Sequence, residues 1–415
     1  MRGIKNEDLR FIIKIWGLSR LLIILALWGI APLLDVPAGH IQPAIDLQAF
    51  AWWDGEWYLK IAAQGYDYID DGQQHSVAFF PLFPLLIHLL TRGGISPELA
   101  GVAIANFAFL GAALLLYFWV KERNGAGAAK WSAAVLVWCP YSLYGTVIYT
   151  EGLFFLLTIL TLQAFEKKEY LKMSLFGILT TATRGPGIAA IPAFLWVSWR
   201  ENRRKIAYAS SVAIAGGICL YSLYCGWQFG DPLAFVKVQA AWGRSRTIDL
   251  LDWWRILMYV AIGVPNYDAG GIKDIGHPLA FISICAIAFG LWKFRDRLGA
   301  ISPYGGAFLI LVLWLLGGDP FLTIFIVLGG ILLLWHTRKK LSLATTLYGF
   351  LSLGLILTSG RSDSSERLAY GIISLSMAAG ILLNKHPRLG YGILGVSGVI
   401  LATFAIRFAQ QLWIA

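Results

Sequence analysis

The stretch FAWWDGEWYLKIAAQGY, residues 50–66, places one carboxylate, Asp54, directly after two tryptophans. A carboxylate can remove the proton from an attacking hydroxyl group, which is general-base chemistry. Arg184, in TATRGPG, carries a planar guanidinium that can pair with the growing charge of a phosphate. These two residue types suit a reaction in which a hydroxyl attacks and a phosphate leaves.

The composition places these residues in a membrane protein. Of the 415 residues, 58% are hydrophobic and only 14% are charged, and the mean hydropathy is +0.65, which excludes a water-soluble chain. Apolar runs recur from residue 11 to the end, without a polar block large enough for a soluble domain. We therefore expect one transmembrane domain, residues 1–415. The first run, 11–34, is too long for the core of a signal peptide and is expected to remain as an anchor.

The positive charge lies in short connectors between apolar runs. The net charge is +10, but its clusters fall between predicted spans, which indicates cytoplasmic loops and no nucleic-acid partner. With the N-terminus cytoplasmic, this rule predicts about 13 transmembrane helices. Some, such as 173–183, are too short to span and are expected to be half-helices or re-entrant. The predicted helices are 11–34, 98–120, 131–146, 150–165, 173–183, 187–199, 206–228, 279–292, 301–317, 321–335, 341–358, 368–384 and 389–410.

Two long non-cytoplasmic stretches, residues 35–97 and 229–278, leave room for polar chemistry. Within the first, 50–65 alternates aromatic and polar residues, and 79–90 is apolar but broken by prolines, so both are expected to be interfacial helices. The topology sends charged residues from five separate loops or span ends to this outer face, where they could share one cavity. They are Asp54, Glu151, Arg184, Asp231, Arg244, Arg246, Arg361, Glu366 and Arg367.

Structural roles would also explain several of these residues. Asp54 fits the N-cap of a helix that Gly65 ends, and Glu151 fits the first turn of the next helix as a partner of its dipole. Arg244, Arg246 and Arg255 could reach lipid headgroups, and Arg361 and Arg367 could pair with Asp363 and Glu366 in a solvated loop. Trp53 and Trp57 fit an aromatic belt at the membrane surface, although such rings also stack on sugars.

Four strings follow one another in the chain: WWDGEWYLKIAAQGY with VAFFPLFPLL, PYSLYGTVIYTEGLFFLL (140–157), TATRGPGI (181–188) and GDPLAFVKVQAAWGR (230–244). In this order they resemble the PIG-V family, which comprises GPI mannosyltransferase II and its bacterial relatives within the GT-C membrane glycosyltransferases. The resemblance runs through roughly the first 250 residues and weakens at SERLAYGI, residues 365–372.

The resemblance implies a GT-C-like fold and an inverting glycosyltransferase. This enzyme would move a hexose, expected to be mannose, from a polyprenyl-phosphate donor to a glycolipid or other envelope glycan acceptor on the non-cytoplasmic side. Asp54 would be the catalytic base, and the arginines Arg184, Arg244 and Arg367 would bind the donor phosphate. The expected supporting or substrate-binding residues are Glu151, Asp231, Trp53, Trp57 and Trp242.

The residues also bear on cofactors, competing functions and location. The sequence has neither a DxD motif nor a histidine cluster that would indicate a metal-dependent nucleotide-sugar donor, so no obligatory cofactor is predicted. Asp54 and Glu56 could still contribute ligands to a divalent metal, and a chelator assay would decide between these alternatives.

A polytopic lipid or glycan transporter is the main alternative function, but the charges gather at one face without evident matched halves. A third possible function is that of a non-catalytic scaffold subunit that binds lipid. We expect a multi-pass protein of a bacterial inner membrane, surrounded by membrane lipids.

Overall fold

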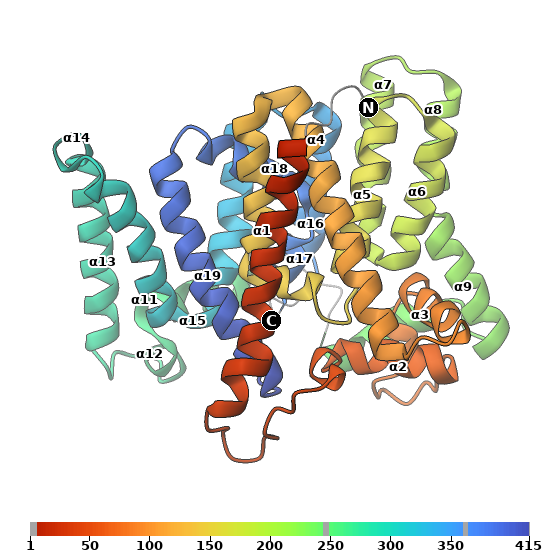
Figure 1. The fold of residues 1–415 in the computed structure, drawn as a ribbon, viewed down its shortest axis with the longest axis horizontal. Coiled ribbons are helices and arrows are strands. Elements are labelled where there is room, and N and C mark those ends of the chain that lie inside the picture. The colour runs from red at the N-terminus through yellow and green to blue at the C-terminus, as the bar shows by residue number, and fades with distance from the viewer. Residues whose placement is uncertain (1–5, 244–248, 360–363, 415) are drawn as a thin grey trace.

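The computed structural model describes residues 6–243, 249–359 and 364–414. In these residues the chain forms helices and turns and no strand, so the predicted all-α class is confirmed (Figure 1). Five helical stretches are long and apolar enough to cross a membrane, and the bent pair α8–α9 would make a sixth. The five are α1 with its continuation (Asn6–Leu33), α4 (Pro97–Trp138), α13 (Gly276–Lys293), α15 (Ile301–Thr337) and α19 (Pro387–Ala409).

The structure does not confirm the count of 13 crossings, and broken helices are one reason. The 42 residues of α4 contain a non-helical residue at Gly125, and the 37 residues of α15 contain one at Gly318. The predicted 206–228 span is bent by 41° between α8 (Lys205–Ala213) and α9 (Gly216–Phe229). The predicted 131–146 helix is wrong beyond Trp138, because Pro140 forces Cys139 into an extended conformation.

Shorter helices complete the fold and carry the polar residues. Before α8 these are α2 (Asp54–Gln64), α3 (Leu82–Arg92), α5 (Glu151–Glu166), α6 (Tyr170–Thr183) and α7 (Ala190–Arg200), with short 3₁₀ turns η5 (Pro140–Gly145) and η6 (Gly185–Ala189). After α9 they are α10 (Ala234–Lys237), η7 (Val238–Trp242), α11 (Leu250–Ile262), α12 (Val264–Asp268), α14 (Arg295–Leu298), α16 (Leu343–Leu357), α17 (Ser365–Tyr370) and α18 (Ile373–Leu383).

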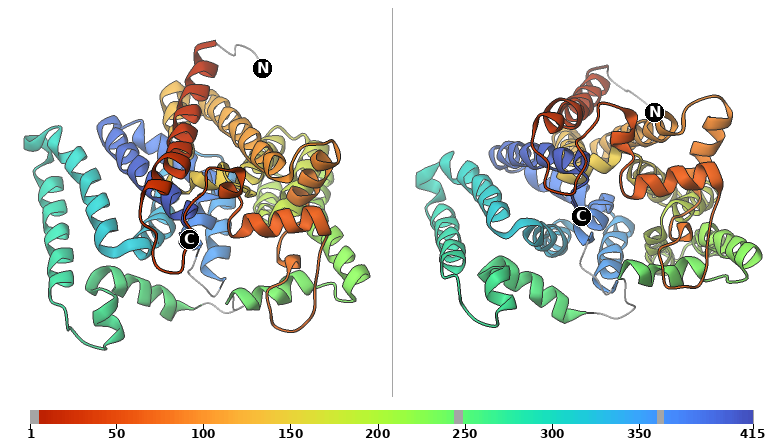
Figure 2. Two further views of the ribbon diagram at one scale, coloured as in Figure 1. Left: turned by 60° about the horizontal axis from the view of Figure 1, so that its bottom comes forward. Right: turned by 90° about the horizontal axis from the view of Figure 1, so that it is seen from below.

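The centre of the bundle is α4, which packs against α1, α5 and α18. Glycines let these helices approach closely. A Cβ atom on Gly380 of α18 would lie 2.3 Å from the backbone nitrogen of Ser132, and one on Gly152 of α5 would lie 2.4 Å from the carbonyl oxygen of Ala105. Such close contacts are typical of helices that pack in lipid. Figure 2 shows α13 and α2 on opposite sides of this bundle.

The basic connectors meet at one end of the bundle. Arg123 lies 2.6 Å from Glu166, and Asn124 donates a hydrogen bond to the carbonyl of Lys340. Repulsion from Lys385 lowers the pKa of Lys340, so the connector that contains Lys340 and the connector that contains Lys385 are neighbours. The α7–α8 turn and α14 lie at the same end in Figure 1, whereas α2 lies at the other end and runs across the direction of α1.

Candidate active site

The site begins at the first turn of α2, where the backbone is strained. Trp53 has φ 60° and ψ −117°, a conformation that favours glycine, and this sharp turn starts the helix at Asp54. Asp54 is therefore the first helical residue and not the N-cap, so the capping role considered for it is wrong. Gly65 ends α2 as expected, with φ 82° and its N–H donating to the carbonyl of Ile61.

A buried, irregular segment between η5 and α5 forms the second part of the site. Arg20, on α1 and only 4% exposed, donates to the carbonyls of Val137 and Ser142 and to the hydroxyls of Ser142 and Thr146, at 2.6–3.1 Å. These bonds satisfy carbonyls that a broken helix end leaves without partners in an apolar environment. Sequence reasoning missed Arg20, although a lone arginine in the apolar run 11–34 is a signal for such a role.

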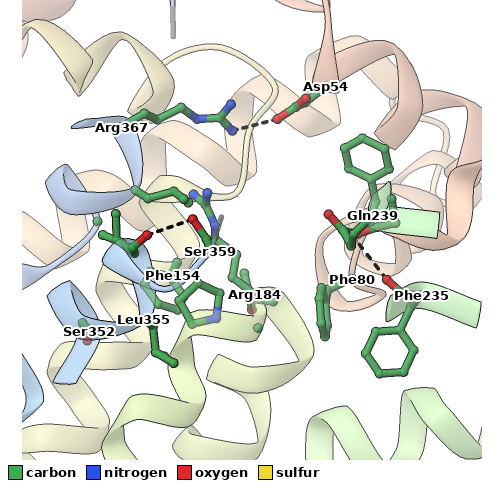
Figure 3. Close-up of a pocket in the computed structure, with 18 of the residues that line it drawn as sticks. Asp54, Phe80, Phe154, Arg184, Phe235, Gln239, Ser352, Leu355, Ser359 and Arg367 are labelled. Atoms are coloured by element: carbon green, nitrogen blue, oxygen red, sulfur yellow. Dashed lines mark hydrogen bonds and ion pairs between the residues drawn. The ribbon is translucent and has the colours of Figure 1, made fainter. Parts of the chain in front are cut away.

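Four charged side chains from four elements meet beside α2. Glu151 Oε1 lies 2.6 Å from Arg184 Nη1 and 2.7 Å from Arg367 Nε, so one carboxylate oxygen holds two guanidinium groups. Arg367 Nη2 also lies 2.7 Å from Asp54 Oδ2 (Figure 3). The Glu151 side chain has no solvent exposure, and that of Asp54 is 29% exposed.

Two tyrosines support this charge cluster. The guanidinium carbon of Arg367 lies 4.4 Å from the ring centre of Tyr144 and 4.6 Å from that of Tyr149, within cation–π range. The Tyr149 hydroxyl accepts a hydrogen bond from the Asp54 N–H and donates one to the carbonyl of Trp52. Both tyrosines lie in the PYSLYGTVIYTEG string, in which the sequence predicts Glu151 as a supporting residue. The contact of the tyrosine rings with an arginine was not predicted. The solvated-loop role considered for Arg367 is wrong, because the residue is 8% exposed.

A cavity of about 360 Å³ opens beside the charge cluster. Asp54, Arg184 and Arg367 line it, while Glu151 lies behind the two arginines and is not part of its lining. In Figure 3, Ser352 and Leu355 of α16 lie on one side of the cavity, and Phe80, Phe235 and Gln239 lie on the other. The remaining lining is mostly apolar, including Phe154, Pro186, Trp242, Tyr348, Ile356, Leu368 and Ile372.

The other predicted residues are placed differently. Trp242 lines the cavity and packs edge-on against Trp57, which is not part of the lining but stacks on Phe79, which is. Trp53 packs edge-on against Trp413. Asp231 does not line the cavity: it pairs with Lys237 at 2.7 Å, and hydrogen bonds from Lys237 and the Leu233 N–H lower its pKa.

Several arginines considered in the sequence cannot be placed at the site. Arg244, Arg246 and Arg361 lie outside the described residues. Arg255 is placed, and it pairs with Asp252 on α11. Among the described residues no group of three or more His, Cys, Asp or Glu side chains could hold a metal ion, and the expectation of no obligatory metal stays a prediction.

Comparison with known proteins supports the resemblance seen in the motifs. Residues 30–202 match the family model described as Mannosyltransferase (PIG-V). This match is shorter than the 250 residues expected, and it does not include the string at 230–244. A human relative, GPI alpha-1,6-mannosyltransferase 2, is 28% identical over 168 residues, which are 37% of this chain and 33% of the relative. The chain thus matches only about a third of that relative's length.

Solved structures extend the likeness to the fold of the whole chain. ArnT from Cupriavidus metallidurans in the apo state is 11% identical, with a TM-score of 0.53 over 97% of this chain and 77% of ArnT. ArnT bound to undecaprenyl phosphate is 13% identical, with a TM-score of 0.50 over 93% of this chain and 62% of ArnT. The protein is a multi-pass membrane protein with the fold of the GT-C glycosyltransferases, and its residues 30–202, which include Asp54, Glu151 and Arg184, match the PIG-V mannosyltransferase family.

Proposed function

We propose that this protein is an inverting glycosyltransferase that moves a hexose, mannose by its family, from a polyprenyl-phosphate donor to a hydroxyl group of a glycolipid or envelope glycan. The observation that carries this proposal is that one carboxylate, Asp54, and two arginines line the same cavity, while Glu151 binds both arginines from behind. The family match supports the sugar, and the lipid-phosphate ligand named for ArnT supports the donor class.

Each group has a defined task in the transfer. Asp54 takes the proton of the acceptor hydroxyl while that oxygen forms a bond to the anomeric carbon. The bond from the anomeric carbon to the phosphate oxygen breaks on the opposite side, and its electron pair stays with the phosphate. Arg184 and Arg367 face the cavity and stabilise the charge that grows on this leaving group. Glu151 is a positioning residue, because it binds both arginines from behind.

The cavity suits a donor that is part lipid and part sugar. Its polar end is the charge cluster, and its apolar lining along α16 offers aliphatic and aromatic contacts. About 360 Å³ lies in the range of small-molecule sites. Trp242, which lines the cavity and packs edge-on against Trp57, is suited to stack on a sugar ring.

The charge distribution supports a site on the non-cytoplasmic side of a bacterial inner membrane. The basic connectors meet at the end of the bundle opposite α2, and such clusters normally face the cytoplasm. In this orientation α2 and α3 are interfacial helices of the first non-cytoplasmic stretch, and the whole chain forms one membrane domain. A transporter would carry its polar groups near the midplane between matched halves, whereas the proposed base, Asp54, lies on α2 at one end of the bundle in Figure 1.

The test is transfer of radiolabelled mannose from polyprenyl-phosphate mannose to a lipid extract by the purified protein. We expect Asp54→Asn to lower the rate by a factor on the order of 10² to 10⁴, since the base is lost. Asp319→Asn is the matched control: Asp319 also pairs with an arginine, Arg407, and is 30% exposed, but it does not line the cavity. Unchanged transfer in Asp54→Asn would reject Asp54 as the base. A parallel reaction with a chelator tests the predicted independence from metal.

A further inference from the structure

The charges of the cluster balance before any substrate is present. Two carboxylates, Asp54 and Glu151, face two guanidinium groups, Arg184 and Arg367. A lipid phosphate adds a further negative charge. In an apolar cavity an unpaired anion is costly, so an entering phosphate competes with the two carboxylates for the guanidinium groups.

The two carboxylates differ in how easily they can be replaced. Glu151 has no solvent exposure, does not line the cavity, and binds both arginines through one oxygen. Asp54 lines the cavity and is 29% exposed, and among the described residues its carboxylate forms an ion pair only with the outer nitrogen of Arg367. Glu151 is therefore the fixed partner of the arginines, and Asp54 is the one that an incoming anion can displace.

We propose that Arg367 binds two anions in turn, which sets the order in which the substrates act. Without donor, Arg367 holds the Asp54 carboxylate, because its Nη2 donates a hydrogen bond to Asp54 Oδ2. The donor phosphate takes over Arg367 and releases Asp54, which can then accept the proton of the acceptor hydroxyl. The base becomes active only once the leaving group is in place. Departure of the polyprenyl phosphate restores the Asp54–Arg367 pair.

The surroundings of Arg367 fit such an exchange. The rings of Tyr144 and Tyr149 and the bond from Nε to Glu151 hold the guanidinium without using Nη2, which faces Asp54. The Asp54 backbone is held separately, by the bond from its N–H to the Tyr149 hydroxyl. The carboxylate can therefore leave Nη2 by side-chain rotation while α2 and Arg367 keep their places.

The inference rests on the proposed function, and a double-mutant cycle tests it by binding instead of by turnover. Undecaprenyl phosphate is titrated into the purified, detergent-solubilised protein, with undecaprenol as the control for binding of the lipid tail. We expect Asp54→Asn to bind the phosphate on the order of tenfold more tightly than the unmodified protein, because the competing carboxylate is gone. We expect Asp319→Asn to bind it as the unmodified protein does.

The second arm separates exchange from simple repulsion between Asp54 and the phosphate. In an Arg367→Met background, exchange predicts that Asp54→Asn no longer tightens binding, whereas repulsion predicts that the gain remains. If Arg367→Met does not fold, Arg367→Lys replaces it, and the gain is then expected to shrink. A gain that persists without Arg367, or no gain in Asp54→Asn, overturns the exchange.

The same titration distinguishes failure of the exchange from failure of the proposed function. Arg184→Met should weaken phosphate binding at least tenfold in either case, since Arg184 does not contact Asp54 in the structure. If the protein binds undecaprenyl phosphate no better than undecaprenol, or if Arg184→Met binds it unchanged, the phosphate site itself is wrong. The exchange then falls with it.

Discussion

Glu151 Oε1 and Arg184 Nη1 lie 2.6 Å apart at the ends of two different helices, and the glutamate side chain has no solvent exposure. A buried ion pair of this kind contributes little net stability when intact, but loss of one partner leaves a charge without compensation. Here two arginines depend on the same carboxylate, so its removal affects both.

We therefore predict that Glu151→Gln lowers the free energy of unfolding by about 3 kcal/mol and abolishes sugar transfer. Thermal unfolding in detergent and the transfer assay measure the two effects. Glu166→Gln is the matched control, because Glu166 is also largely buried and pairs with Arg123 at 2.6 Å, at the other end of the bundle. It should lose stability but keep its transfer rate per folded molecule. Full transfer by folded Glu151→Gln would contradict the positioning role.

Arg367 should not tolerate lysine. Its Nε and Nη2 bind two different carboxylates, and an ammonium group cannot reproduce this fork. We expect Arg367→Lys to lower kcat by a factor on the order of 10² to 10³, with correct folding. Arg255→Lys, at an exposed pair with Asp252, should leave kcat unchanged. Equal kcat values for Arg367→Lys and the unmodified protein would show that a single positive charge is sufficient.

The strained backbone at Trp53, directly before Asp54, should affect the stability of variants at this position. Both Trp53→Ala and Trp53→Gly lose the contact with Trp413, but only glycine adopts φ 60° and ψ −117° without strain. Trp53→Gly should therefore be more stable than Trp53→Ala by about 1–2 kcal/mol. Chemical unfolding of the two variants gives this difference directly. A more stable alanine variant would mean that the turn relaxes in solution.

Arg20 should be essential for stability and not for chemistry. Arg20→Leu removes the guanidinium that donates to the buried carbonyl of Ser142, and it leaves the carbonyl of Val137 with the Ser142 hydroxyl as its donor. We expect a loss of about 2–5 kcal/mol, measured by thermal unfolding. Arg10→Leu, an exposed position on the same helix, is the control and should unfold as the unmodified protein does. A small effect of Arg20→Leu would show that other groups hold the segment before Glu151.

The loop after α2 should be sensitive to acid. Burial alone would raise the pKa of Asp67, but hydrogen bonds from Ser76 and Lys60 outweigh it and lower the pKa to about 2, from 3.8. Because the folded-state pKa is the lower one, the stabilisation is present above pH 4 and is lost as the pH falls towards 2. Asp67→Asn should flatten the dependence of the melting temperature on pH in this range. An unchanged slope would indicate that Asp67 is not responsible.

Asp54 and Glu151 have similar sequence surroundings, but the structure places their side chains in different environments. Both are acids at the first position of a helix, and sequence patterns suggested helix capping or a dipole contact for each. In the folded chain Glu151 is fully buried behind two arginines, and Asp54 faces a cavity. Local sequence cannot distinguish these positions, because burial depends on elements far away in the chain.

The sequence by itself determined the class of the protein and the all-helical fold, and it predicted Asp54, Glu151 and Arg184 as candidate site residues. Composition indicates whether the chain lies in lipid or in water, and short motifs indicate which residue types suit a given chemistry. It did not determine the broken helices, the support from Arg20, Tyr144 and Tyr149, or which arginine meets Asp54. Arg367 follows Asp54 by 313 residues, and its contact with the carboxylate is a product of how α4, α5, α15 and α17 pack. Only tertiary structure decides such a pairing, because helix packing brings together side chains whose separation along the chain carries no information about their distance.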